Sequence, residues 1–312
     1  MRELIRKTGV YRAIGAAREE TFSQAVLVVF PDGKYLRQLL KECAKRFFGA
    51  EDGGRVSELI EKESFSDCLI YPAAEKKLTA ELCGEIVEES LLRPVEGDKK
   101  LFVLDGFHTA PQLVQNKLLK LLEEPPAGVY FLLGAETEFS VLPTVLSRVK
   151  KFARSPFSEE EVEAALERKY PGVEGIREAA AASGGIFSVA ESLLSGGGED
   201  FRLAGEFLSL NGSEKFCREI GERKNKREFF AALRAILRDM LFWGTGQGRH
   251  AKLKSETVRK LAADFPTGAA LKALELVSEA EKQIQFNAGF GSCLYALALE
   301  LKEEKEKWKR LS

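Results

Sequence analysis

The sequence contains few of the residues that build metal centres. Its 312 residues include only two histidines, His108 and His250, which excludes metal sites made of several histidines. None of its five cysteines forms a Cys-x-x-Cys pair, which excludes zinc-ribbon and thioredoxin-type motifs. An odd number of scattered thiols is typical of a protein in a reducing cytosol.

Long apolar runs and an excess of one charge are also absent. No run of about 18 apolar residues occurs, so we expect no membrane-spanning helix. Residues 1–20 carry charges throughout and lack an apolar core, so we expect no secretory signal and a cytoplasmic protein. The 47 Lys and Arg residues nearly balance 48 Asp and Glu, which argues against a generally basic nucleic-acid coat.

The first half of the chain alternates short apolar runs with amphipathic stretches. The runs predict buried strands at 25–30, 68–71, 100–104 and 129–133. The amphipathic stretches predict helices at 34–48, 79–89, 109–124 and 142–147. Such repeated βα units indicate a parallel sheet covered by helices on both faces.

After about residue 153 the strand pattern disappears. Ser158 and Glu161 have the spacing of a capping box at the start of a helix, and a triple glycine at 196–198 is the best linker in the chain. The apolar stripes in 229–241 and 294–301 predict long amphipathic helices. We therefore expect three domains: an α/β domain at 1–153, a small helical domain at 154–198 and a helical domain at 199–312.

Lys34 occupies the place where a phosphate-binding loop would end, after the first strand and at the start of a helix. The full motif needs a glycine at position 28 and a hydroxyl at position 35, where this chain has Val28 and Tyr35. One interpretation is a nucleotide held by Lys34 and the helix N-terminus. The other is an ordinary βα turn that uses Asp32 and Gly33 for its geometry.

Asp105 directly follows a buried strand, where a carboxylate would hold a magnesium ion in an ATPase. The next residue is Gly106, whereas an active enzyme of this kind has a second carboxylate to polarise the attacking water. The alternative is a turn residue that starts the next helix. In both cases we expect no ATP hydrolysis, because the complete phosphate loop, the hydroxyl for magnesium and the second carboxylate are all missing.

Two longer runs carry a resemblance to a known family. They are Asn-Lys-Leu-Leu-Lys-Leu-Leu-Glu-Glu-Pro-Pro at 116–126 and Leu-Pro-Thr-Val-Leu-Ser-Arg at 142–148. Together with the strand that ends at Asp105, they resemble the clamp-loader subunits of the AAA+ family, and among these the delta-prime subunits of bacterial DNA polymerase III. The similarity is strong over 98–155 and weaker elsewhere; Asn287 precedes a leucine-rich helix that resembles the end of the family's collar domain.

The resemblance implies a fold and a role for two residues. The fold is a RecA-like AAA+ domain with a parallel sheet, a helical lid and an all-α collar. In the family, a Ser-Arg-Cys motif supplies an arginine finger to the ATP of a neighbouring subunit; Ser147 and Arg148 match it, and Val149 replaces the cysteine. Taken alone, Arg148 could equally be a surface arginine in a salt bridge.

The departures from the family pattern favour a subunit that does not hydrolyse ATP. The zinc module is missing, the phosphate loop is incomplete, and the sensor position is occupied by the nonpolar Gly134 and Ala135. The resemblance then implies that Lys34 and Asp105 are vestigial, that this chain binds no cofactor, and that ATP and Mg²⁺ lie on neighbouring motor subunits.

The implied partners are the motor and delta subunits of a hetero-pentamer, the sliding clamp and primer-template DNA, with no membrane. The isolated chain would catalyse nothing, although it would belong to a DNA-directed DNA polymerase holoenzyme, a transferase.

Two alternatives of other classes stay open. One is an active AAA+ ATPase with a divergent phosphate loop. The other is a DNA-binding adaptor that acts through 218–260, where basic residues outnumber acidic ones by twelve to five. The plainer interpretation of this stretch is surface charge on a helical domain.

Overall fold

The computed structural model describes residues 1–16, 23–74, 76–195, 198–209, 213–222, 226–253, 255–285 and 289–311. They form two compact units, Met1–Pro156 and Phe157–Ser312. The further division of the second unit at residue 198 stays a prediction.

The first unit contains a five-stranded parallel sheet with the order β2-β3-β4-β1-β5. Its strands are β1 (Ala25–Val29), β2 (Cys68–Tyr71), β3 (Lys100–Leu104), β4 (Val129–Ala135) and β5 (Lys150–Ala153). The first four confirm the predicted strands. The sequence did not reveal β5, because it is a largely exposed edge strand that begins with two lysines.

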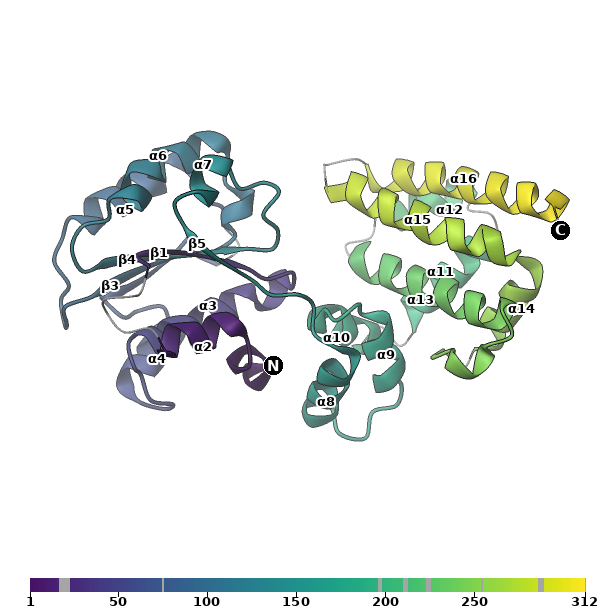
Figure 1. Cartoon of the computed structure of the whole chain (residues 1–312), viewed down its shortest axis with the longest axis horizontal. Helices are drawn as coiled ribbons and strands as arrows, with labels where there is room; N and C mark the ends of the chain where they lie inside the picture. Colours follow the sequence, from purple (N-terminus) through teal and green to yellow (C-terminus); the bar gives the residue numbers. More distant parts are fainter. Residues whose placement is uncertain are drawn as a thin grey trace. The chain divides into compact units, whose positions relative to one another are not determined.

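Helices cover both faces of this sheet (Figure 1). One face carries α2 (Gly9–Ala16), α3 (Gly33–Phe47) and α4 (Arg55–Glu61), and the opposite face carries α5 (Ala80–Ser90), α6 (Gln112–Glu123) and α7 (Pro143–Leu146). The short α1 (Arg2–Arg6) packs on α3. The three layers and the strand order give the RecA-like AAA+ fold that was predicted.

Thr109 corrects one predicted helix start. The sequence spacing suggested that it caps the helix at 109–124, but a short 3₁₀ helix (Phe107–Thr109) ends there and α6 begins at Gln112. The Thr109 hydroxyl instead donates a hydrogen bond to the carbonyl of Gly106 at 2.8 Å. Gly106 has a φ of 62°, so the turn after β3 uses the glycine and the hydroxyl together.

The described part of the second unit contains helices and turns and no strand. Its α-helices are α8 (Glu159–Lys169), α9 (Ile176–Ala182), α10 (Phe187–Ser195), α11 (Glu199–Ser209), α12 (Glu214–Gly221), α13 (Lys226–Gly244), α14 (Glu256–Asp264), α15 (Thr267–Gln285) and α16 (Phe290–Leu311). The predicted capping box is confirmed, because the Ser158 side chain accepts from the Glu161 N–H and the Glu161 side chain accepts from the Ser158 N–H.

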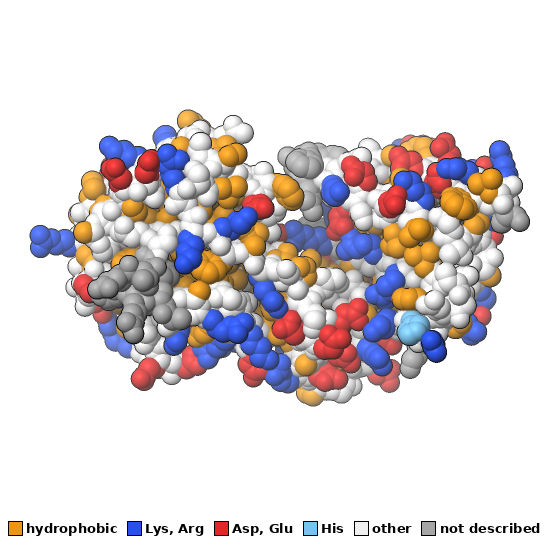
Figure 2. Space-filling model, in the orientation of Figure 1, with side chains coloured by type: hydrophobic (Ala, Val, Ile, Leu, Met, Phe, Trp, Pro, Cys, Tyr) orange, Lys and Arg blue, Asp and Glu red, His pale blue; other side chains and the backbone are white. Residues whose placement is uncertain are grey.

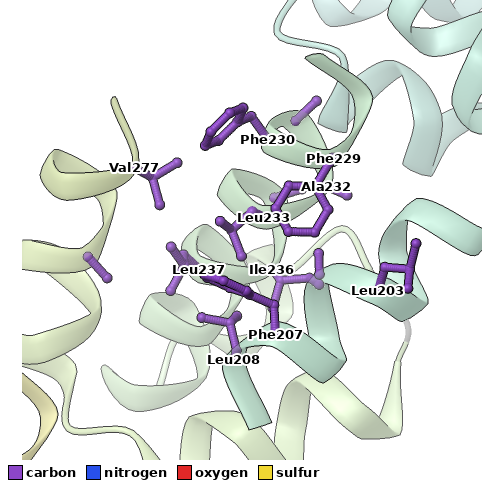
Figure 3. Close-up of a cluster of buried hydrophobic side chains, with 14 of the residues drawn as sticks. Leu203, Phe207, Leu208, Phe229, Phe230, Ala232, Leu233, Ile236, Leu237 and Val277 are labelled. Atoms are coloured by element: carbon purple, nitrogen blue, oxygen red, sulfur yellow. The ribbon is translucent and has the colours of Figure 1, made fainter. Parts of the chain in front are cut away.

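Helix α13 lies at the centre of the second unit's core. Figure 3 shows its apolar side chains, among them Phe229 and Leu237, between α11 and α15. Phe207 of α11 meets the Phe229 ring edge-on at 5.7 Å between centroids. The apolar stripe predicted at 229–241 is therefore the seam along which these helices pack.

Candidate functional site

The residues predicted to bind nucleotide lie at the carboxyl edge of the parallel sheet. Val29 at the end of β1 is paired with Ala135 at the end of β4, so the loops that follow these strands leave from the same edge. Lys34 follows β1, and Asp105 directly follows β3. This edge is where ligands bind in open α/β sheets.

Asp105 is neutralised by an arginine of the same unit. Nη1 of Arg37, on α3, donates hydrogen bonds to Asp105 Oδ2 at 3.0 Å and to the carbonyl of Pro72 at 3.1 Å. The other two guanidinium nitrogens donate to the carboxylate of Glu63 at 2.8 and 2.5 Å. A guanidinium therefore occupies the position at which Asp105 would meet a metal ion, and the residues present do not fit bound magnesium.

The same arginine belongs to a row of three basic residues on α3, Arg37, Lys41 and Lys45, each of which has an acidic partner. Glu63 also lies 2.9 Å from Nζ of Lys41, one turn further along the helix. The hydrogen bond from Arg37, together with the Lys41 ammonium, lowers the pKa of Glu63 to about 2. The row continues through the ion pairs of Lys45 with Glu42 and Glu61. The pairs with Glu61 and Glu63 attach the end of α4 and the residues after it to α3.

A carboxylate also lies at the N-terminus of α3. A Cβ placed on Gly33 would overlap the carboxyl group of Glu136, the residue after β4. The Glu136 backbone N–H donates to Nδ1 of His108 at 3.3 Å. Negative charge is favourable at a helix N-terminus, and the site that would receive a phosphate already has a carboxylate.

Lys34 is exposed, and its ammonium lies 5.6 Å from the centre of the Tyr35 ring. The structure thus places Lys34 and Asp105 at one edge of the sheet but gives each a partner within the chain.

Gly134 explains the missing sensor side chain. A Cβ on this glycine would lie 2.5 Å from Cδ1 of Leu40, which is fully buried on α3. Helix α3 therefore packs against β4 too closely to admit a polar side chain there.

Arg148 lies just after α7 with its side chain 30% exposed. Its Nε donates to Oε2 of Glu123 at 3.0 Å, and its Nη2 lies 2.9 Å from the same oxygen. Its Nη1 donates to the carbonyl of Thr144 at 2.9 Å and to Oγ of Ser147 at 3.3 Å. Ser147 Oγ donates in turn to the Thr144 carbonyl at 3.0 Å.

These contacts join the two runs that carry the family resemblance. Glu123 is the last residue of α6, within the run at 116–126, and Arg148 ends the run at 142–148. A second link is Gln115 of α6, whose side chain donates to the Ser140 carbonyl and accepts from the Leu142 N–H. The segment before α7 is therefore fixed to α6 at two points.

The sequence did not identify Arg37, Glu63, Glu136 or Glu123 as residues of the site. Arg37 and Glu63 are ordinary charged residues in the sequence, and only the packing of α3 against the segment after α4 brings them to Asp105. Glu123 could have been noticed because it lies inside the most distinctive run of the chain.

At least four of the nine described basic residues of 218–260 form ion pairs within the second unit. Arg218 pairs with Glu214, Arg234 with Glu281, Arg238 with Asp239, and Lys252 with Glu159. On the face drawn in Figure 2, basic and acidic side chains are interspersed over the helices. Arg223, Lys224 and Lys254, like Asn287 and residues 196–197, lie outside the described residues. The pairing favours surface charge over a DNA-binding face.

The described part of the chain offers neither a metal cluster nor a membrane-spanning helix. No group of three or more His, Cys, Asp or Glu side chains there could hold a metal ion. No helix in that part of the chain has the length and apolar character needed to cross a membrane.

Comparison with known proteins gives matches to DNA polymerase III subunits. The family described as "DNA polymerase III, delta subunit" matches residues 10–158. The subunit tau/gamma of Haemophilus influenzae is 36% identical over 104 residues, which are 33% of this chain and 15% of the relative. The subunit tau of Escherichia coli is 34% identical over 109 residues, 35% of this chain and 17% of the relative. The similarity thus spans less than a fifth of the length of these two relatives.

Two solved structures align over most of the chain at low identity. The gamma subunit-related protein of Thermotoga maritima gives a TM-score of 0.45 at 17% identity and covers 94% of this chain and 97% of its own. The DNA clamp loader delta protein of Bacillus subtilis gives a TM-score of 0.34 at 13% identity, with 95% and 98% covered.

Residues 10–158, which include the five-stranded sheet, are thus similar to the family described as "DNA polymerase III, delta subunit". This similarity and the two characteristic runs are consistent with a clamp-loader AAA+ subunit.

Proposed function

We propose that the chain is a clamp-loader subunit of the delta-prime kind, which hydrolyses no ATP itself and extends Arg148 to the ATP site of a neighbouring subunit. It would act with motor and delta subunits in a hetero-pentamer that places a sliding clamp on primed DNA. A cytoplasmic location, as part of the polymerase holoenzyme, follows from this role.

The main observation that supports the proposal is the ion pair between Arg37 and Asp105. An ATPase of this fold needs its strand-end carboxylate free to hold magnesium, and here the carboxylate has a guanidinium 3.0 Å away. The Glu136 carboxyl group at the N-terminus of α3 adds repulsion toward phosphate. Both features favour a non-hydrolysing subunit over an ATPase with a divergent loop.

Three features of Arg148 support its proposed role as an arginine finger. It is partly exposed, it ends the run that resembles the family's finger motif, and its guanidinium is held in a defined orientation by three acceptors. A guanidinium in trans stabilises the charge that develops on a transferring phosphoryl group. Ser147 takes part by accepting one of the Arg148 hydrogen bonds.

Equilibrium binding of labelled ATP with Mg²⁺ to the isolated chain tests the first part. We expect no saturable binding, and no difference between the wild type and Lys34→Ala. An ATPase motor subunit under the same conditions is the positive control. Tight binding that is lost in Lys34→Ala would overturn the proposal in favour of an active ATPase.

A second titration with primed DNA tests the adaptor alternative. We expect no binding by the isolated chain at physiological salt, because at least four of the nine described cations of 218–260 already form ion pairs with acidic side chains. Binding whose affinity falls steeply with salt would favour a direct DNA contact instead.

A further inference from the structure

In the proposed function, Arg148 contacts a phosphate of the neighbouring subunit's ATP. Its long side chain lies at the surface of the first unit. An unrestrained arginine loses rotational freedom when it is fixed at an interface, and this loss weakens whatever it binds. The contacts that restrain Arg148 before any neighbour arrives therefore matter to its effect.

Three acceptors restrain the guanidinium of Arg148, and they are of two kinds. The Thr144 carbonyl and the Ser147 hydroxyl belong to the same short helix and turn as the arginine itself. The Glu123 carboxylate comes from a different element, the end of α6, 25 positions earlier in the chain. Of the three acceptors, only Glu123 ties the arginine to α6.

The contact geometry leaves one side of the guanidinium available. Nε and Nη2 both face a single oxygen of Glu123, and Nη1 faces Thr144 and Ser147. The two hydrogens on Nη2 cannot both point at that one oxygen, so an N–H of Nη2 can serve an external acceptor. Glu123 is itself 56% exposed, so a phosphate can approach the pair without burying it.

We propose that Glu123 is a positioning residue, which holds the Arg148 guanidinium in the orientation that a neighbouring subunit's ATP requires. This inference rests on the proposed function, since it assigns a role only if Arg148 is the finger. Glu123 acts through Arg148 and makes no contact with the nucleotide.

The next residue offers a matched control. Glu124 is also exposed and also a glutamate, and it ends the same helix as the C-cap of α6. It forms no ion pair with another described residue. Glu124→Ala therefore removes a charge at this helix end and leaves the Arg148 contact in place.

The experiment measures steady-state ATP hydrolysis by the reconstituted complex, with this chain as wild type or as a variant. The part of kcat that is lost in Arg148→Ala defines the finger-dependent rate. We expect Glu123→Ala to lower this rate about two- to fivefold, the range that an exposed ion pair gives, with KM for ATP unchanged. Glu123→Gln keeps an oxygen that can accept from Nε and is expected to lose less. Glu124→Ala is expected to match the wild type.

The double variant Glu123→Ala with Arg148→Ala separates positioning from any other role. If Glu123 acts only through Arg148, the double variant hydrolyses ATP at the rate of Arg148→Ala alone. Thermal unfolding and gel filtration of each variant show whether the chain folds and assembles.

Each other outcome has a distinct meaning. A Glu123→Ala complex with the wild-type rate, while Arg148→Ala is slow, overturns the inference and leaves the proposed function intact. A further loss in the double variant below Arg148→Ala also overturns it, because Glu123 then acts elsewhere. An unchanged rate in Arg148→Ala with assembly intact removes the finger role itself.

Discussion

The guanidinium of Arg37 and the carboxylate of Asp105 lie 3.0 Å apart at the carboxyl edge of the sheet, although the residues are 68 positions apart in the chain. Both side chains are largely buried, at 18% and 20% exposure. The pair ties the end of β3 to α3 within the first unit. Its partner Glu63 extends this contact to the segment after α4.

Arg37→Ala is expected to lower the free energy of unfolding by about 1–3 kcal/mol, because it leaves two partly buried carboxylates without their main partner. Urea unfolding followed by circular dichroism measures this change. Circular dichroism is needed because both tryptophans, Trp243 and Trp308, lie in the second unit. Arg93→Ala, at an exposed position, is the control and is expected to stay within about 0.5 kcal/mol of the wild type. Equal stability of the two variants would show that the Arg37 contacts contribute nothing.

The lowered pKa of Glu63 predicts how the stability of the first unit changes at acid pH. Its pKa is about 2 in the folded chain, below the ordinary 4.5, so the ionised carboxylate stabilises the fold. That stabilisation is fully present above about pH 4.5 and is lost as the pH falls toward 2. The difference in unfolding free energy between the wild type and Glu63→Gln is therefore expected to shrink over this range. Glu58→Gln, at an exposed position on α4, is the control; a difference that does not change with pH would contradict the assignment.

Two glycine substitutions are expected to have opposite signs. Gly134→Ala places a methyl group 2.5 Å from the buried Leu40 side chain and is expected to destabilise the fold by about 1–3 kcal/mol. Gly84→Ala, on the exposed side of α5 with no atom within 4 Å of the new Cβ, is expected to stabilise it by about 0.5–1 kcal/mol. Thermal unfolding of both variants measures the two effects. A neutral Gly134→Ala would mean that a sensor side chain is missing for another reason than space.

Strongly apolar segments were the part of the fold that the sequence could predict. The strands at 68–71 and 100–104 were predicted with the bounds that the structure has, because each is a short apolar run bounded by polar or turn-forming residues. The edge strand β5 and the helix α4 were missed. Both are short. The strand β5 forms by pairing with β1, which is distant in sequence, and α4 packs on α3.

The candidate site was predicted only as far as single residues allow. Lys34, Asp105, Ser147 and Arg148 were found from their positions after strands or in recognisable runs. Their partners Arg37, Glu136 and Glu123 were not, because a charged residue on a helix surface has no sequence mark that tells which carboxylate or guanidinium it will meet. Tertiary packing decides which of these charged residues meet, and it gives the candidate site its partners from within the chain.

The ATPase rate of a reconstituted complex that contains Arg148→Ala decides whether Arg148 acts on a neighbouring subunit's ATP. If Arg148 is the finger, we expect the rate to fall by the contribution of one ATP site, while the complex still assembles. Arg148→Lys is expected not to restore it, since an ammonium lacks the planar fork of the guanidinium, and Arg93→Ala is expected to match the wild type. An unchanged rate in Arg148→Ala, with assembly intact, would contradict the account.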